Sequence, residues 1–481
     1  MDYEPVIALE IHAQLLTQSK IFCGCSTQFG AIQNSQVCPV CAGMPGTLPV
    51  LNQKVVELAI KMGLALNCRI NAHSVFARKN YFYPDLPKGF QISQYAAPLC
   101  QEGFLEIEVE GVAQKIRIMR IHLEEDAGKS IHAEAFVPED QTFIDLNRCG
   151  VPLIEIVTQP DFRAPAAAFV FLKQICQIVQ YLEICDGNLA EGSVRCDANI
   201  SLRPVGTTKL GVKTEIKNLN SFHGVVKALE FEIDRQSAVL ESGGRVIHET
   251  LLWDAQMNRA IPMRSKEIAP DYRYFPEPDL APLQVSQALI ESIQADLPEL
   301  PAARKKRFIE HYQLSDYDAA IITENREIAD YFEQCLQDTS FSKDVSNWIM
   351  GEVLHFLNNN KIKISAFPII PQNLAALINL INQGTISRKI GKTVFEKMTA
   401  TGKSPENIIE AEGLNQLSDI SKLTPVIQDV LESNLNQVVQ YRNGKKKLLG
   451  YFIGQVMQQT AGKANPQIVR ALLMKKLDAF K

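Results

Sequence analysis

Apolar and polar residues alternate along several stretches of the first 290 residues, which is the pattern of β-strands with one buried face. In residues 6–15 this period of two places Glu10 and His12 beside each other on one face. Core faces seldom carry both residue types, so this face is expected to line a site, although a solvated sheet face would show the same pattern. The remaining predicted strands are a hairpin over 104–123 that turns at Gly111, and the stretches 147–157, 191–200 and 213–218.

The second strand of the hairpin ends in a dense group of charges. Arg120, His122 and Glu124 share one face of it, and Glu125 begins the following turn. Two later strands repeat a polar face, with Arg195 and Asp197 on one and Glu215 on the other. A sheet lined in this way favours a concave polar site over a set of solvated edges.

Helical periodicity replaces the alternation after about residue 286, between breaks at Pro298, Pro301, 358–360 and 368–371. Two earlier helices are expected, at about 164–183 and at 221–242, the second closed by two glycines. The predicted fold class is therefore α+β. It consists of a β-rich cradle domain, a helical domain and a small all-helical tail domain, over residues 1–290, 291–384 and 385–481.

Composition agrees with a water-soluble protein, because 46% of the 481 residues are hydrophobic and 21% are charged. Neither a run of about 18 apolar residues nor a signal peptide is visible, so we expect a cytoplasmic protein without a membrane partner. The net charge of −5 is uneven: residues 385–481 carry +7 and the remainder carries −12. Such a basic end suggests contact with a polyanion, with chance clustering as the alternative.

The consecutive acids Glu124, Glu125 and Asp126 have two readings. They form an acidic turn in water, or they neutralise a hard cation such as Mg²⁺, which prefers carboxylate oxygens and usually binds next to substrate phosphates. The following Gly128-Lys129-Ser130 resembles the end of a P-loop. That motif requires a glycine at position 123, where the chain has leucine, so a P-loop is excluded.

Four of the eleven cysteines form two close pairs, Cys23 with Cys25 and Cys38 with Cys41. This arrangement suits a structural zinc site with four thiolates, and reduced metal-free thiols are the alternative. An odd number of cysteines scattered along a long chain argues against a disulfide framework.

Residues 78–90 combine cations, aromatic residues and turn formers, including Lys79. Such a loop suits stacking on a base and binding of phosphate, and it is equally compatible with a packed surface loop.

At these motifs the chain resembles the GatB family, the B component of the heterotrimeric aspartyl/glutamyl-tRNA amidotransferases. The resemblance runs from end to end and in order, and the motifs are specific only in combination. They are residues 9–20, the cysteine pairs, 80–89, 122–129, 192–199, 271–279, 450–457 and 462–466.

The resemblance implies an enzyme that uses ATP and Mg²⁺ to phosphorylate the side-chain carboxylate of misacylated Glu-tRNA(Gln) or Asp-tRNA(Asn). Ammonia that the amidase subunit of the heterotrimer releases from glutamine would then displace the phosphate, and a third, small subunit would brace the other two. Misacylated tRNA is the expected nucleic-acid partner, contacted by the basic tail. Two alternative functions are considered. One is a zinc-stabilised tRNA-binding scaffold without chemistry of its own, and the other is a free-standing glutaminase, for which no amidase-like stretch is visible in the sequence.

Phosphoryl transfer requires that the reacting groups are positioned and that the charge of the phosphates is neutralised, so the candidate residues are those that can bind metal or phosphate. We expect Glu10, His12 and Glu125 to hold Mg²⁺, with His12 acting directly or through water, Glu124 beside them or on a second ion, and Zn²⁺ on the four cysteines. Asp197, Glu155 and Glu215 are candidates for orienting water, ammonia or metal. The expected catalytic residues are Glu10, His12, Lys79, Glu124 and Glu125, and the expected ligands of the nucleotide or acyl-phosphate are Lys79, Arg120, Arg195 and Asp197.

Overall fold

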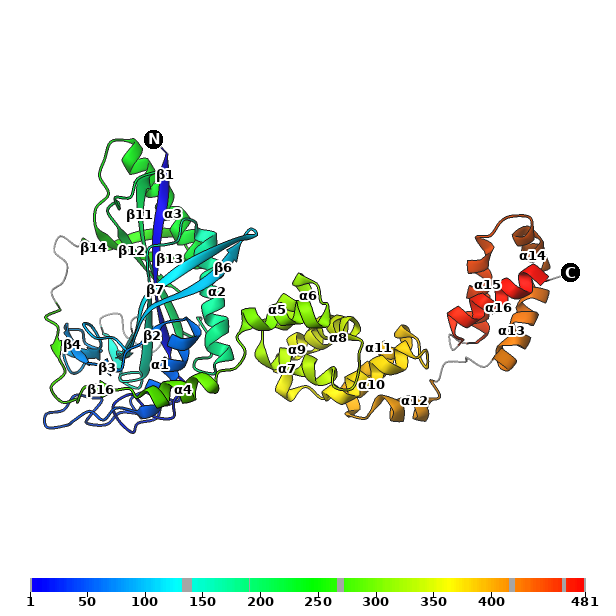
Figure 1. Ribbon diagram of the computed structural model, residues 1–481, viewed down its shortest axis with the longest axis horizontal. Helices are drawn as coiled ribbons and strands as arrows, with labels where there is room; N and C mark the ends of the chain where they lie inside the picture. The colour runs from blue at the N-terminus through cyan, green and yellow to red at the C-terminus, as the bar shows by residue number, and fades with distance from the viewer. Residues whose placement is uncertain are drawn as a thin grey trace. The chain divides into compact units, whose positions relative to one another are not determined.

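The structure is a computed structural model that describes residues 2–131, 141–189, 191–265, 272–414, 420–460 and 464–479. It divides into two units, Met1–Pro301 and Ala302–Lys481 (Figure 1). Asp271, Gly462 and Lys463, which belong to two of the motifs above, lie outside the described residues. No helix in the described ranges combines the length and the apolar character needed to cross a membrane.

The first unit is built on a nine-stranded sheet with β1 at its centre. Neighbouring strands are antiparallel except β12 and β13, which are parallel. In order across the sheet the strands are β14 (Arg259–Ser265), β13 (Glu249–Asp254), β12 (Thr214–Leu219), β11 (Val194–Pro204), β1 (Tyr3–Gln14), β10 (Pro152–Thr158), β7 (Val112–Glu125), β6 (Cys100–Val109) and β2 (Arg69–Ile70).

One face of this sheet is the core of the unit. Ile7, Leu9 and Ile11 of β1 are fully buried, in one apolar cluster with side chains of the covering helices. Polar residues between them consequently face the other way. The helices of this unit are α1 (Gln53–Ala65), α2 (Pro165–Tyr181), α3 (Phe222–Glu241) and α4 (Gln287–Ala295), and Figure 1 shows α2 and α3 beside the sheet.

A β-bulge in β7 decides which of its residues face the core. Val157 of β10 is opposite Arg120 and Thr158 is opposite Ile118, so Met119 is an extra residue in β7. Even-numbered isoleucines are buried before the bulge, whereas Ile121 and Leu123 are buried after it. Because a shift of one residue exchanges the faces of a strand, the bulge turns the even-numbered residues that follow towards the polar face.

Three small sheets border the large one. They are β15 (Phe275–Pro276) with β4 (Ala77–Asn80) and β5 (Phe90–Ser93), β16 (Leu283–Gln284) with β3 (His73–Ser74), and β8 (Lys129–Ile131) with β9 (Phe143–Asp145). The pairing of β15 with β4 places the aromatic segment that starts at Tyr272 next to Lys79.

The second unit is helical in its described residues. One apolar cluster runs from Phe308 to Ile409 and another from Leu423 to Leu477, so residues 385–409 pack with the helices that precede them. The helices are α5 (Pro301–Tyr312), α6 (Asp316–Ile322), α7 (Arg326–Cys335), α8 (Ser342–Trp348), a π-helical turn (Ile349–Val353), α9 (Leu354–Asn360), a 3₁₀ turn (Ile364–Ala366), α10 (Pro371–Asn382), α11 (Arg388–Thr401), α12 (Pro405–Glu412), α13 (Ile420–Glu432), α14 (Leu435–Arg442), α15 (Leu448–Gln459) and α16 (Pro466–Ala479). A mixed sheet with helices in the first unit and helices after it confirm the α+β fold predicted from the sequence.

Candidate active site

The polar face of the large sheet brings residues from four adjacent strands together. His12 of β1 lies opposite Glu155 of β10 on one side and Arg195 of β11 on the other. His122 of β7 is opposite Glu155, and Glu10 is opposite Asp197. The register of the central strands therefore collects charged residues that are far apart in the sequence.

His12, Glu124 and Glu155 form the centre of this face. His12 Nε2 is 3.3 Å from Glu124 Oε1 and 3.6 Å from Glu155 Oε2. One ligand atom from each residue lies within 4.8 Å of the others, which is a geometry that can hold a metal ion. The two carboxylates offer Mg²⁺ the oxygen ligands that it prefers, and the imidazole of His12 adds a nitrogen ligand, so these residues can hold the expected ion.

The electrostatics of the centre also favour a bound cation. Burial disfavours protonation of His12, but Glu155 and Glu124 outweigh burial and raise the pKa of His12 to about 10. Two buried carboxylates thus produce a local negative potential that a proton or a metal ion offsets. A divalent ion would compete with the proton for the same imidazole nitrogen.

His122 supports the centre from β7. Its Nε2 lies 3.0 Å from Glu155 Oε2. Burial would raise the pKa of Glu155, but His122 and His12 outweigh burial and hold it well below the usual value. His122 Nδ1 is buried and has no hydrogen-bond partner among the described residues, so one polar atom of the site stays available for a ligand or water.

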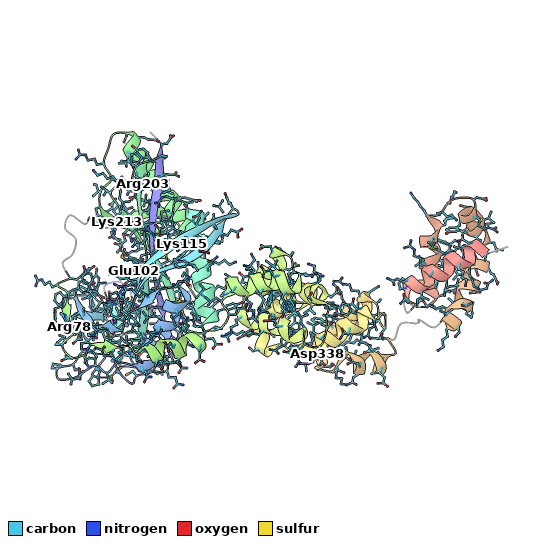
Figure 2. The ribbon with its side chains drawn as sticks, in the orientation of Figure 1. Arg78, Glu102, Lys115, Arg203, Lys213 and Asp338 are labelled. Atoms are coloured by element: carbon cyan, nitrogen blue, oxygen red, sulfur yellow. The ribbon has the colours of Figure 1, made fainter. Side chains whose placement is uncertain are left out.

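Glu10 belongs to a second group, on β1, β11 and β12. Asn199 Nδ2 donates to Glu10 Oε1 at 3.0 Å, and Lys213, labelled in Figure 2, donates to Asn199 Oδ1 at 3.0 Å. Lys217 Nζ lies 2.6 Å from Asp197 and 2.9 Å from Glu215.

This arrangement leaves Glu10 with a raised pKa. Burial is the largest cause, followed by the nearby carboxylates of Glu155 and Glu215. A buried carboxyl of this kind can accept or release a proton closer to neutral pH than a solvated one.

Arg195 is held at the other end of β11 by Asp126. The Arg195 Nη2 atom donates to Asp126 Oδ2 at 2.8 Å, and Gln14 donates to the same oxygen at 3.0 Å. Burial opposes ionisation of Asp126, but Arg195 and then Arg148 outweigh burial and lower its pKa. Arg195 Nε is buried without a hydrogen-bond partner in the described part of the chain, as expected for a group that binds an anion.

Lys79 approaches the same face from β4. Burial lowers the pKa of its ammonium group, but Glu124 is the leading influence among those that raise it above the usual value. Its Nζ lies 5.0 Å from the ring centroid of Tyr272 and 5.8 Å from that of Tyr81. The lysine is therefore charged, lies against two aromatic rings and interacts electrostatically with Glu124.

Glu125 is not brought together with His12, contrary to the expectation from the sequence. It follows Glu124 directly in β7, so its side chain points to the opposite side of the sheet. There Glu125 Oε1 accepts from Ile92 N at 2.8 Å and pairs with Lys88. These residues line a separate cavity of about 260 Å³ beneath the cysteine loop, and Glu124 and Glu155 stand next to His12 instead.

The importance of two further residues, His122 and Glu155, becomes visible only from the register of the strand pairs. His122 was expected on the polar face without a role, and Glu155 had only a weak one. Because both contact the His12 centre through pairing of β10 with β1 and β7, no spacing within the sequence signals them. Asp126 was expected only as a member of the acidic cluster and Asn199 was given no role; that they hold Arg195 and Glu10 depends on the same strand register.

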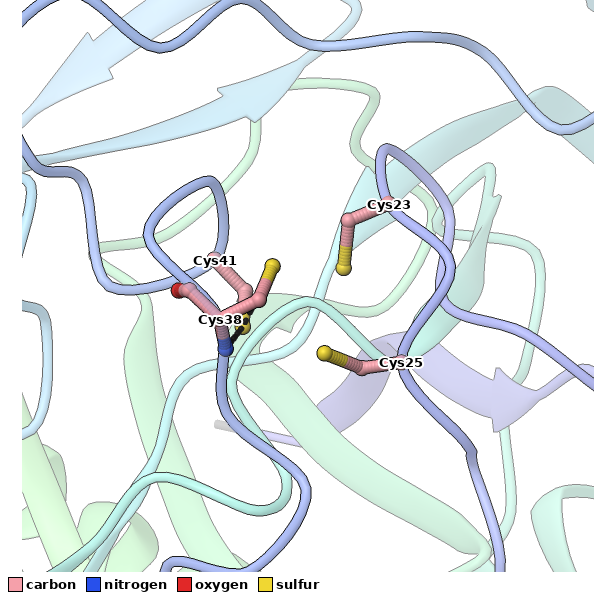
Figure 3. A group of neighbouring side chains, drawn as sticks. All are labelled: Cys23, Cys25, Cys38 and Cys41. Carbon is pink, nitrogen blue, oxygen red and sulfur yellow. Dashed lines mark hydrogen bonds between the residues drawn. The ribbon is translucent and has the colours of Figure 1, made fainter.

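The four paired cysteines also converge (Figure 3). Ligand atoms of Cys23, Cys25, Cys38 and Cys41 lie within 4.8 Å of one another, and all four thiols are free. Lys20 Nζ is 3.5 Å from the sulfur of Cys41. A hydrogen bond from Cys23 is the main cause that lowers the pKa of Cys41 to about 4. The cluster has the donors of a closed tetrahedral zinc site and can hold that ion.

Comparison with known protein families decides the affiliation of this chain. A family model described as GatB/GatE catalytic domain matches residues 5–291, and a model described as GatB domain matches residues 330–477. The chain belongs to the GatB family. The first match spans the whole sheet with its polar face, and the second spans most of the helical unit.

Similar proteins agree with the GatB models along the whole chain. A protein of Thermodesulfovibrio yellowstonii is 56% identical over 475 residues, which are 99% of each chain. Proteins of Geotalea daltonii and Geobacter sulfurreducens are each 54% identical over 477 residues, covering 99% of this chain and all of theirs. All three are named as the B subunit of aspartyl/glutamyl-tRNA(Asn/Gln) amidotransferase, so the resemblance seen in the sequence is confirmed.

The cysteine cluster predicts about one zinc ion per chain, measured by elemental analysis of the purified protein. Cys38→Ser should lower the zinc content several-fold and lower the temperature of unfolding, because the loop loses a ligand that closes it. Cys68→Ser, a change at a buried thiol outside the cluster, is the control and should retain the metal. Purified wild type without zinc, with four freely titratable thiols in the loop, would contradict the assignment.

Proposed function

We propose that this chain is the B subunit of an aspartyl/glutamyl-tRNA amidotransferase. It binds misacylated tRNA, phosphorylates the side-chain carboxylate of the attached Asp or Glu with ATP, and amidates the product with ammonia. The observation that supports this most is the convergence of two carboxylates, two imidazoles and two cations on one sheet face in a chain of the GatB family.

The reaction divides into two successive displacements. A carboxylate oxygen attacks the γ-phosphorus of ATP, the bond to the bridging oxygen breaks, and ADP leaves with the electron pair. Ammonia then attacks the acyl carbon, the C–O bond to phosphate breaks, and inorganic phosphate leaves while the nitrogen loses a proton. Activation is required because a free carboxylate has no acceptable leaving group.

The side chains of the polar face divide these tasks. His12, Glu124 and Glu155 would hold Mg²⁺, which neutralises charge on the transferring phosphoryl group when bound. Lys79, Arg120 and Arg195 bind phosphate oxygens, and Asp126 keeps Arg195 in position. Glu10, with its raised pKa, accepts the proton that the attacking ammonia loses. Asp197 and Glu215, both held by Lys217, orient the nitrogen by accepting hydrogen bonds from its N–H groups, which leaves its lone pair free to attack.

The proposal includes the partners and the setting of the enzyme. A separate amidase subunit supplies ammonia, because none of the described residues on the polar face is a nucleophile suited to glutamine hydrolysis. A third, small subunit completes the heterotrimer, the second unit of this chain contributes the tRNA contact, and the complex works in the cytoplasm. The boundary between the helical domain and the basic tail domain is proposed to lie between the two apolar clusters of that unit, that is, between Ile409 and Leu423 of the sequence.

The main alternative is a tRNA-binding scaffold without chemistry. A scaffold needs phosphate contacts but not buried carboxylates that repel each other at short range. The burial of Glu124 and Glu155 therefore favours the enzyme.

Glu124→Gln should lower ATP-dependent transamidation by the assembled enzyme at least roughly 100-fold, because it removes a charged metal ligand while keeping the side-chain volume. Acyl-phosphate formation, measured by trapping with hydroxylamine, should fall by the same factor, and glutamine hydrolysis should persist. Glu106→Gln, at an exposed position of the hairpin formed by β6 and β7, is the matched control. Near-normal transamidation by Glu124→Gln at ordinary Mg²⁺ concentration would exclude the proposed metal site.

The basic tail generates a separate prediction for tRNA. Deleting residues 416–481 should raise the KM for misacylated tRNA about tenfold or more, since phosphate contacts by Lys and Arg supply much of the affinity. Glutamine hydrolysis should not change. A milder variant replaces the exposed Lys445, Lys446 and Lys447 by alanine, and Lys306→Ala in α5 is its control. An unchanged KM in the deletion variant, or an unchanged dependence of KM on salt, would show that the tail does not contact tRNA.

A further inference from the structure

Five tyrosines form a continuous row at the border of the polar face. In order of contact the row is Tyr83, Tyr81, Tyr272, Tyr274 and Tyr95. The first contacts are edge-to-face, with ring centroids 6.0 to 6.2 Å apart. The last differs, because the rings of Tyr95 and Tyr274 are stacked, with centroids 4.2 Å apart and planes inclined by 7°.

The row is fixed in place by the strand pairing of β4 and β15. Asn80 N donates to Tyr272 O at 2.9 Å, and the Asn80 side chain donates to Arg273 O at 2.9 Å. Arg78 forms two hydrogen bonds with Glu277, at 2.8 and 2.9 Å. These contacts anchor the segment that carries Tyr272 and Tyr274 without help from Tyr95.

The stacked end of the row adjoins the cations of the candidate active site. Arg120 Cζ lies 6.0 Å from the ring centroid of Tyr95, and Arg120 Nε is buried with no hydrogen-bond partner among the described residues. Lys79 Nζ is 5.0 Å from the ring centroid of Tyr272. The Tyr274 hydroxyl interacts electrostatically with Lys79, Glu155 and Arg120. A flat aromatic surface and two cations therefore lie side by side, next to the His12 centre.

Tyr95 does not behave as a packing residue. Its side chain is 52% exposed, although it is large and lies above a well-packed sheet. A residue that only tied the Tyr272 segment to the sheet would gain more from burial. An exposed ring that is already held parallel to a partner is preorganised to accept a further planar group, because its orientation is fixed before binding.

We propose that Tyr95, stacked on Tyr274, is the platform that binds the adenine ring of ATP, with Arg120 and Lys79 binding its phosphates. The inference rests on the proposed function and extends it to the base. A nucleoside triphosphate carries a planar base and a chain of phosphates in one molecule, which is the combination that the row and the two cations accept. Bases stack on aromatic side chains without requiring hydrogen bonds to the base.

The test compares Tyr95→Ala, Tyr95→Leu and Tyr95→Phe in the full chain. Binding of ATP and of inorganic tripolyphosphate is measured by calorimetry in the presence of Mg²⁺. Loss of the ring should weaken ATP binding roughly 5- to 100-fold in the alanine and leucine variants. Tyr95→Phe should bind ATP like the wild type, since it keeps the ring, and tripolyphosphate should bind equally well to all four proteins. Tyr95→Leu keeps apolar bulk and so separates stacking from packing.

The assembled enzyme provides the second readout. The alanine and leucine variants should show a raised KM for ATP and an unchanged KM for misacylated tRNA. Unchanged ATP affinity in both variants, an equal loss for tripolyphosphate, or a raised KM confined to tRNA would each overturn the proposal. Failure of the wild type to bind ATP with Mg²⁺ would instead refute the proposed function.

Discussion

Glu124 and Glu155 repel each other, and the structure keeps them close. One carboxylate oxygen of Glu124 lies 3.3 Å from His12 Nε2, and one of Glu155 lies 3.6 Å from the same atom. Both carboxylates are in a region where burial weakens screening by water. Backbone pairing of β7, β10 and β1 fixes this proximity. The stability of the folded sheet therefore offsets the repulsion between the two carboxylates. A cation relieves the repulsion, which makes the apposition of the two acids the feature on which the proposed chemistry depends.

The same strand that supplies Glu124 separates two environments. Up to Ile118 the even-numbered residues of β7 face the core, and the bulge at Met119 reverses this order. His122 and Glu124 then reach the polar face, while Glu125 pairs with Lys88 on the other side of the sheet. Alternation along the strand sends two consecutive glutamates to opposite faces, and the extra residue decides that Glu124 reaches the His12 centre and Glu125 the cavity beside the cysteine cluster.

Much of this organisation could be predicted from the sequence, for physical reasons that differ between elements. Alternation identified β1, the hairpin of β6 and β7, and the shared face of Glu10 and His12, because the period of two is a local property. The cysteine pairs could be grouped for a similar reason, since their spacing is short. The role given to Glu155 and the misplacement of Glu125 show the limit of such inference. Which residues meet across neighbouring strands depends on register, and register is set by contacts between segments far apart in the chain.

A crystal structure of the assembled enzyme with a non-hydrolysable ATP analogue and Mn²⁺, located by its anomalous scattering, would test the proposed metal site most directly. We expect manganese between His12, Glu124 and Glu155, with the phosphates of the analogue directed towards Lys79 and Arg195. Metal and phosphates bound in the cavity beside Lys88 and Glu125, with the His12 centre empty, would contradict this assignment.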